Sequence, residues 1–147
     1  MTITISEHAP PPEGDYASIS IAFEVREVFD VVTAPDGRLH LAPSPRPLAV
    51  PWVKDYDREP GGHPTEWAGR FDTSRWGVLA AAVAGVRVGG ATIAWDAPEV
   101  GLLDRRRDVA VLWDIRVAPA ARGRGVEQVG SAGGGALCAP PATTVAI

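Results

Sequence analysis

The stretch Trp113-Asp114-Ile115-Arg116-Val117-Ala118-Pro119-Ala120-Ala121-Arg122-Gly123-Arg124-Gly125-Val126 decides the fold of this chain. It begins in the apolar run Val109–Val117, which predicts a buried β-strand, and then passes through a short turn that contains Pro119. The glycines of the Arg-Gly-Arg-Gly sequence let successive backbone N–H groups approach an anion, because no Cβ stands in the way. The arginines add charge-assisted hydrogen bonds. The stretch therefore predicts a strand that leads into a pyrophosphate-binding loop, and a solvated basic turn is the alternative.

Length and composition indicate one globular domain. The chain has 147 residues, of which 46% are hydrophobic and 22% are charged. These values are close to the globular average and exclude a wholly disordered, collagen-like or coiled-coil protein. The formal net charge of −4 provides no overall basic field, so nucleic acid is not expected as a partner.

Cysteine and histidine usage argue against a disulfide framework and against a metal site. Cys138 is the only cysteine and the chain has three scattered histidines, so we expect no metal and a reducing compartment. The N-terminus has no positively charged start, and no run of 18 uncharged apolar residues occurs. We therefore expect a cytoplasmic protein without a membrane partner. Lys54 is the only lysine among 14 basic residues, which indicates a GC-rich genome.

Alternating apolar residues predict a first long strand over residues 19–31. Residues 1–17, with three consecutive prolines at 10–12, are expected to form a flexible lead-in because proline cannot donate to a sheet ladder. The sequence Ala-Pro-Asp-Gly at 34–37 predicts a turn, and residues 38–41 are expected to return as a short strand.

The proline-rich segment 43–72 predicts an irregular loop without long helices. Asp55, Tyr56 and Asp57 lie in it, and its carboxylates would suit a cationic ligand, so they are candidate substrate-binding residues. Aromatic residues that cap a core edge are the alternative interpretation. Further along, Gly77–Val83 and residues 88–95 predict a β-hairpin. Two glycines at 89–90 inside its second strand indicate a bulge or a close backbone approach.

The loop and the strand before it resemble the acetyl-coenzyme A motif of the GCN5-related N-acetyltransferases. The motif reads Arg or Gln, two residues, Gly, one residue, then Gly or Ala, and Arg122 and Gly125 match it. The longer sequence LWDIRV followed by RGRGV is similar to a bacterial subgroup that includes streptothricin-type acetyltransferases. The resemblance covers about residues 19–126, so we expect a partial acetyltransferase domain at 18–126.

The resemblance implies a mixed α/β fold, that of the acyl-CoA N-acyltransferases, with a largely antiparallel central sheet and few, short helices. It also implies transfer of acetyl from acetyl-CoA, as co-substrate, to a primary amine of a small molecule or a protein. The main chains of Ile115 and Val117 would hold the pantetheine, and the loop would hold the pyrophosphate. The residues of that loop are Arg122, Gly123, Arg124, Gly125 and Val126.

Asp114 is the candidate catalytic residue that the resemblance implies. An acidic residue on this strand serves some relatives as a general base or as an anchor for a cationic amine. The alternative is a structural ion pair with Arg116 or its surroundings. Strict alternation along the strand would place Asp114 on the face opposite Trp113 and Ile115.

The motif's last small residue is replaced by Glu127, whose carboxylate would repel a pyrophosphate. The following glycine-rich sequence disfavours the helix that the family has there. We therefore expect residues 127–147 to be a low-complexity tail outside the family sequence, in a chain truncated or frameshifted after Val126, with the C-terminal half of the domain missing.

Three functions stay open at this point. The chain is an N-acetyltransferase with impaired activity, a catalytically inactive fragment, or a scaffold that self-associates through the open edge of Val109–Val117. The acceptor amine also stays open. An aminoglycoside-like or streptothricin-like amine, a polyamine, an amino acid and a protein N-terminus all fit the resemblance.

Overall fold

The computed structural model describes residues 2–12, 14–126 and 144–146. The chain divides into two compact units rather than the single one expected from its length. We call Met1–Ile21 together with Asp57–Ile147 the sheet unit, and Ala22–Tyr56 the ribbon unit. Each is described by itself.

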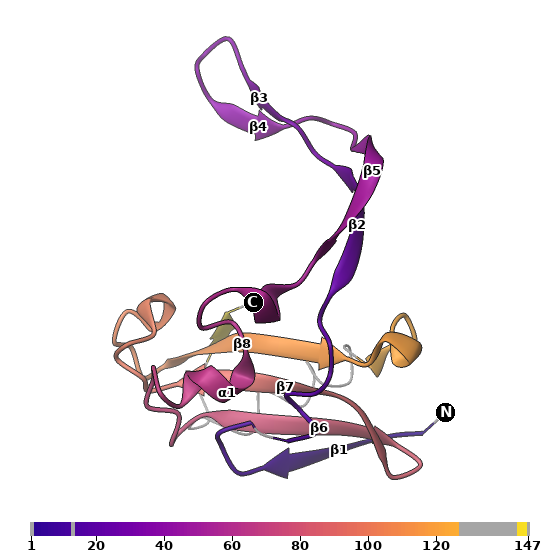
Figure 1. Cartoon of the computed structure of the whole chain (residues 1–147). Coiled ribbons are helices and arrows are strands. Elements are labelled where there is room, and N and C mark those ends of the chain that lie inside the picture. The colour runs from indigo at the N-terminus through magenta and orange to yellow at the C-terminus, as the bar shows by residue number, and fades with distance from the viewer. Residues whose placement is uncertain (1, 13, 127–143, 147) are drawn as a thin grey trace. The chain divides into compact units, whose positions relative to one another are not determined.

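The sheet unit contains a five-stranded sheet in the order β1-β6-β7-β8-β9 (Figure 1). Neighbouring strands are antiparallel except β9, which is parallel to β8. The predicted largely antiparallel central sheet is therefore confirmed. Its strands are β1 (Ile3–His8), β6 (Gly77–Val83), β7 (Val86–Trp95), β8 (Val109–Val117) and β9 (Thr144–Ala146).

Strands β6 and β7 form the predicted hairpin, and β7 begins two residues earlier than the sequence indicates. Ala84 and Gly85 make the turn with positive φ angles of 50° and 79°, as a two-residue hairpin loop requires. Gly89 and Gly90 lie where neighbouring strands pass very close. A Cβ at Gly90 would lie 2.5 Å from the carbonyl oxygen of Leu79, so the predicted close approach is confirmed.

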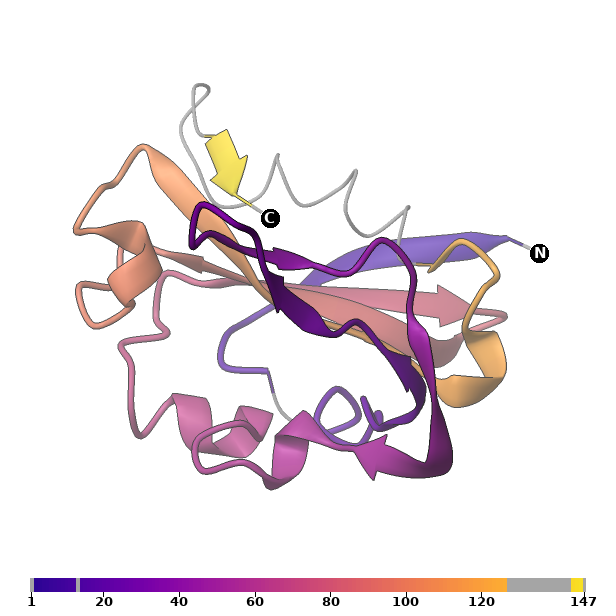
Figure 2. The same ribbon diagram turned by 90° about the horizontal axis from the view of Figure 1, so that it is seen from above.

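The short helix α1 (Pro64–Trp67) lies on one side of the sheet (Figure 2). The core between this helix and the sheet is rich in aromatic side chains. Trp67 and Trp76 are buried, and both rings pack against Trp113 of β8 with centroids 6.3 and 5.5 Å apart. Such contacts combine a large buried apolar area with favourable ring geometry. The other helical elements that lie wholly within the described residues are single 3-10 turns, namely η1 (Tyr56–Arg58), η2 (Gly101–Leu103) and η3 (Pro119–Ala121).

The N-terminal segment departs from the prediction of a flexible lead-in over residues 1–17. Strand β1 pairs antiparallel with β6 along its whole length, and Tyr16 is fully buried in the aromatic core. The prolines do end the strand, since none lies within β1. The sequence pattern missed β1 because only Ile3 and Ile5 show its alternation before the prolines begin.

The ribbon unit holds two separate two-stranded sheets, β2 (Phe23–Val28) with β5 (Arg46–Lys54) and β3 (Val31–Thr33) with β4 (Leu39–Leu41). The prediction of one strand over 19–31 in the central sheet is therefore wrong, because alternation indicates a strand without identifying its partner. The predicted return at 38–41 is confirmed as β4. The segment predicted to be an irregular loop, 43–72, contains strand β5. Both strands of a two-stranded sheet are edge strands, so β5 can contain Pro47 and Pro51.

Candidate functional site

A β-bulge in β8 determines where its side chains point. Thr92 is opposite Asp114 and Ile93 is opposite Leu112, so Trp113 is the additional residue. Such a bulge breaks the alternation of faces. Trp113 packs in the aromatic core, and Asp114 bonds to Tyr16 of that same core. The expectation that Asp114 and Trp113 lie on opposite faces is wrong for this reason, while Ile115 does lie on the other face.

Asp114 accepts a short hydrogen bond from Tyr16, with 2.5 Å between the hydroxyl oxygen and Oδ2. Burial raises the pKa of the Tyr16 hydroxyl, and the negative charge of Asp114 together with this hydrogen bond raises it further. Tyr16 is therefore a neutral donor over the whole physiological range. It fixes one oxygen of the Asp114 carboxylate.

Arg116 brings Asp114 together with Asp57. Its Nε donates to Asp114 Oδ2 at 2.8 Å, and its Nη1 and Nη2 donate to the two carboxylate oxygens of Asp57 at 2.9 and 2.7 Å. Nη1 also donates to the carbonyl oxygen of Ile19 at 3.1 Å. Burial acts to lower the pKa of the guanidinium, but the two carboxylates outweigh it and the pKa is raised.

These four residues form one largely buried polar network, which we call the Arg116 network: Tyr16, Asp57, Asp114 and Arg116. Arg116 is fully buried, and the side chains of Asp57 and Asp114 are 14% and 12% exposed. With both carboxylates ionised, the network carries a net charge of −1.

Two of the three predicted substrate-binding residues, Tyr56 and Asp57, lie in the 3-10 turn η1, and Asp55 directly precedes it. Asp57 belongs to the sheet unit and to the Arg116 network, while Asp55 and Tyr56 belong to the ribbon unit. The Tyr56 ring packs against Phe23 with centroids 6.3 Å apart and lies 4.6 Å from Lys54 Nζ.

The predicted pyrophosphate loop follows β8 and η3. Gly123 and Gly125 have positive φ angles of 69° and 82°, which side chains with a Cβ rarely adopt. No described residue accepts a hydrogen bond from the backbone N–H of Gly123, Arg124 or Gly125. Arg124 is exposed and forms no ion pair with any described residue. The loop thus presents backbone donors and one cationic side chain.

Arg122 supports the chain rather than extending into solvent. Its Nε donates to the carbonyl oxygen of Val117 at 3.0 Å, and its Nη2 donates to that of Ser20 at 2.6 Å. Val126 ends the loop with helical backbone, and its buried side chain packs with Val117 and Ala121. Glu127 lies outside the described residues, as does the tail through residue 143.

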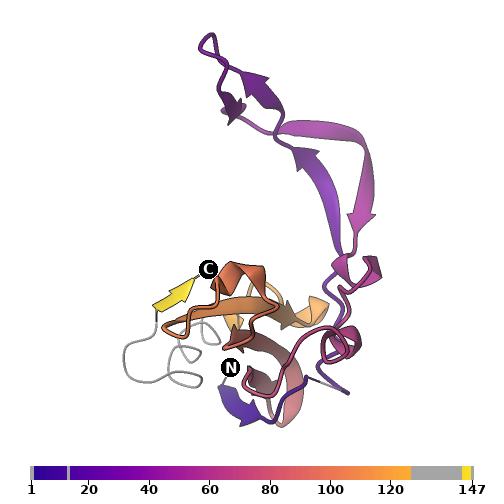
Figure 3. The same ribbon diagram turned by 90° about the vertical axis from the view of Figure 1, so that its left-hand side faces the viewer.

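The free edge of β8 is partly covered. Strand β9 pairs with Val109–Val111 only (Figure 3), and no described strand pairs with residues 112–117 on that edge. Our expectation of a fully open edge is therefore wrong for the first three residues of β8. The main chains of Ile115 and Val117, the predicted pantetheine contacts, lie in the uncovered part.

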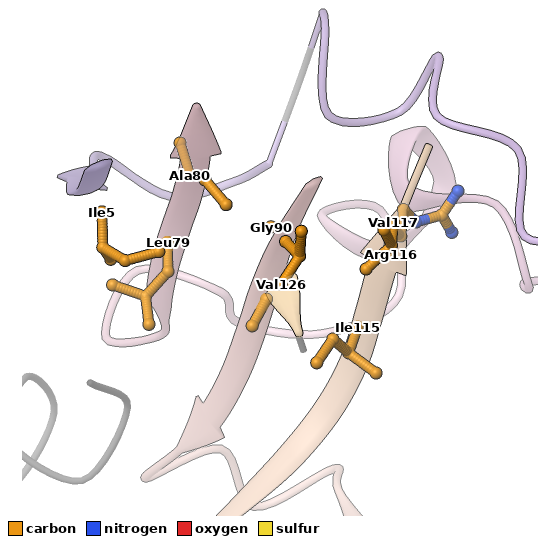
Figure 4. A pocket seen from close by; sticks show the side chains of 10 residues that line it. Ile5, Leu79, Ala80, Gly90, Ile115, Arg116, Val117 and Val126 are labelled. Atoms are coloured by element: carbon orange, nitrogen blue, oxygen red, sulfur yellow. The ribbon is translucent and has the colours of Figure 1, made fainter. Parts of the chain in front are cut away.

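The side chains of Ile115 and Val117 line a cavity of about 10 Å³ on the sheet face opposite the Arg116 network. In Figure 4 the Arg116 guanidinium points away from the apolar side chains that surround this cavity. A space of this size holds at most one water molecule. A ligand of β8 would therefore have to bind along its edge.

Two solved structures share this fold. One is a nourseothricin acetyltransferase, with 20% sequence identity and a TM-score of 0.57; the match covers 90% of this chain and 64% of that chain. The other, from Bacillus anthracis str. Ames, is described as a streptothricin acetyltransferase in complex with acetyl coenzyme A. It has 14% identity and a TM-score of 0.58, and the match covers 94% of this chain and 66% of that one. The fold is that of the acyl-CoA N-acyltransferases.

This acyl-CoA N-acyltransferase fold confirms, at the level of structure, the resemblance to streptothricin acetyltransferases that the loop motif indicates. The chain spans 64% and 66% of the length of the two structures. No protein-family model matches the chain, and no curated protein gives a significant match.

The sequence analysis did not identify Tyr16, and it considered Arg116 only as a possible ion-pair partner of Asp114. Arg116 carried a signal, because an arginine within an apolar strand needs a buried partner. Tyr16 carried none, since it follows three prolines in a segment predicted to be flexible.

The described residues contain no group of three or more His, Cys, Asp or Glu side chains able to hold a metal ion. None of the helices among them is long and apolar enough to cross a membrane.

Proposed function

We propose that the chain binds acetyl-CoA and transfers the acetyl group to a primary amine. The observation that carries this proposal is the continuity of two features of the sheet unit. The uncovered edge of β8 leads directly into a loop whose backbone N–H groups have no acceptor among the described residues. Extended chains bind well along such an edge, and anions bind well to such a loop.

The loop residues fit a pyrophosphate. Positive φ angles at Gly123 and Gly125 turn the chain without a Cβ at either position, and Arg124 supplies an exposed cation beside the N–H groups of the loop. Arg122 stabilises the loop through the carbonyl oxygens of Val117 and Ser20. When bound, acetyl-CoA would supply an activated thioester. The backbone groups of Ile115 and Val117 would orient it along β8.

Asp114 is the residue that we propose to receive the amine. Both of the hydrogen bonds that it accepts from described residues fall on Oδ2, and none of them falls on Oδ1. Oδ1 can therefore accept a hydrogen bond from an incoming ammonium or take up a proton as the amine becomes nucleophilic.

The acceptor that we favour is a small cationic amine of the streptothricin class. The names of the two structural neighbours support this choice, together with the carboxylates of Asp57 and Asp114. We also propose a bacterial, cytoplasmic protein, in agreement with the arginine-rich composition and the single cysteine.

The test is thiol release by the purified chain with acetyl-CoA and a panel of amines. We expect release that depends on both substrates and is reduced at least about a hundredfold by Asp114→Asn, because removal of a general base typically costs about 10² to 10⁴ in rate. Asp108→Asn is the matched control, since Asp108 is an exposed carboxylate paired with Arg106. Thiol release that is unchanged by Asp114→Asn would exclude this role.

A second candidate function is acetyl-CoA binding without turnover. It is favoured by the two donors on Asp114 Oδ2, Tyr16 and Arg116, because they hold the carboxylate in a largely buried structural network. Calorimetric binding of coenzyme A without thiol release for any amine would support this second function over the first.

A further inference from the structure

The ribbon unit carries most of the exposed apolar surface of the described chain. Of the eleven large hydrophobic residues that are exposed, nine lie in this unit, and they are 44 to 78% exposed. The nine are Phe23, Phe29, Val31, Leu39, Leu41, Val50, Trp52, Val53 and Tyr56. Such a concentration on one part of a protein indicates an interaction surface.

The pairing of β3 with β4 places several of these exposed apolar side chains next to one another. Val31 is opposite Leu41 and Thr33 is opposite Leu39, so these side chains share one face of the small sheet. The three apolar residues of that face are each more than 60% exposed. An isolated two-stranded sheet is marginally stable in water, so an apolar face on one requires a partner.

The exposed apolar area of the ribbon unit is similar to the area that each partner buries in a specific dimer. These nine residues, which are 44 to 78% exposed, present on the order of 700 Å² of apolar surface. A standard interface buries about 800 Å² on each partner.

The charges favour a second copy over an oppositely charged partner. The unit has five acidic and four basic side chains, so it is nearly neutral. It contains the ion pairs Arg26–Glu24, Arg38–Asp36 and Arg46–Asp30. Two such units neither repel each other nor attract a strongly charged molecule.

The backbone identifies the edge that can pair. Pro47 and Pro51 remove N–H donors from β5, as in strands protected from edge-to-edge association. Strand β2 contains no proline, and among the described residues its only strand neighbour is β5. An antiparallel pairing of β2 with its own copy satisfies two-fold symmetry and gives a four-stranded sheet.

We infer that the ribbon unit mediates homodimerisation through antiparallel pairing of β2 with the β2 strand of a second copy. A two-fold axis at Val25 places Glu24 of each copy opposite Arg26 of the other. Opposite charges in direct cross-strand positions are stabilising, and like charges there are destabilising.

The test is the oligomeric state, measured by light scattering and sedimentation. We expect a dimer for the unmodified chain and at least about tenfold weaker dimerisation for Glu24→Arg and for Arg26→Glu, because each variant creates two like-charge pairs. Mixing the two single variants should restore dimers, since each then supplies the charges that the other lacks. Recovery on mixing would show that residues 24 and 26 contact each other across the two chains, because an effect confined to a single chain would persist in the mixture.

The matched control reverses another exposed ion pair of the same spacing, Asp36–Arg38, by Asp36→Arg and Arg38→Glu. These variants and their mixture should dimerise like the unmodified chain. Trp52→Glu should weaken the dimer, and Leu102→Glu, an exposed apolar position outside the unit, should not. A monomeric unmodified chain, or mixed variants that stay monomeric, would overturn the inference.

Discussion

Arg116 donates two hydrogen bonds to Asp57, at 2.9 and 2.7 Å, although 59 residues separate them in the sequence. The same guanidinium holds Asp114 and the carbonyl oxygen of Ile19. The buried guanidinium of Arg116 thus links β8 to the segments that contain Ile19 and Asp57, both in the sheet unit. The stability of that unit should depend on it.

Arg116→Met should destabilise the chain by about 3 to 5 kcal/mol, because removal of one partner leaves two largely buried carboxylates uncompensated. Urea unfolding followed by tryptophan fluorescence measures this loss. Arg106→Met is the control, since the Arg106–Asp108 pair is exposed and should contribute less than about 1 kcal/mol. Equal losses for both variants would contradict a special role for Arg116.

Tyr16→Phe should lower the free energy of unfolding by about 1 to 3 kcal/mol, because it removes a buried donor to an ionised carboxylate while keeping the ring in the core. The chain's other tyrosine provides the control. Tyr56 is 48% exposed, so Tyr56→Phe should change stability by no more than about 0.5 kcal/mol. The two variants are compared by thermal and urea unfolding.

The raised pKa of Tyr16 predicts a stability loss at alkaline pH. In the unfolded chain this hydroxyl ionises near its ordinary value of 10.0, whereas in the folded chain the neutral form is retained to higher pH. Its contribution to stability is therefore complete below pH 10.0 and decreases as the pH rises above that value. Absorbance at about 295 nm in the Tyr56→Phe variant isolates Tyr16. Its ionisation should coincide with unfolding, and reversible titration at its ordinary pKa in the folded chain would contradict the buried hydrogen bond.

Gly90→Ala should destabilise the sheet unit by about 1 to 3 kcal/mol through overpacking. The added Cβ would lie 2.5 Å from the Leu79 carbonyl oxygen and 2.8 Å from the Tyr16 ring. Gly101→Ala is the control, because no heavy atom lies within 4 Å of a Cβ there. Thermal unfolding compares the melting temperatures of the two variants. A melting temperature unchanged by Gly90→Ala would show that β6 and β7 leave more space at Gly90 than this close approach implies.

Arg124→Ala should weaken coenzyme A binding by about ten- to a hundredfold, the equivalent of one charge-assisted hydrogen bond of about 1.5 to 3 kcal/mol. Arg105→Ala removes the same charge from a different exposed loop and should leave binding unchanged. Isothermal titration calorimetry compares the two. Equal weakening by both variants would indicate a general charge effect instead of a site at Arg124.

The sequence by itself determined the strands whose neighbours are close along the chain. The hairpin of β6 and β7, the full extent of β8 and the glycine loop after it follow from local pattern, because turn chemistry and apolar runs act over a few residues. The motif around Arg122 and Gly125 also indicated the acyl-CoA N-acyltransferase fold.

Only the tertiary structure decided which distant residues meet. A single additional residue, Trp113, breaks the alternation of β8 and turns Asp114 toward Tyr16, and no local pattern reveals a bulge of this kind. Similarly, alternation predicted strand character in β2 but could not show that it pairs with β5 rather than with the central sheet. Pairing and buried charge compensation depend on contacts between segments far apart in sequence, so they are fixed by packing and not by local propensity.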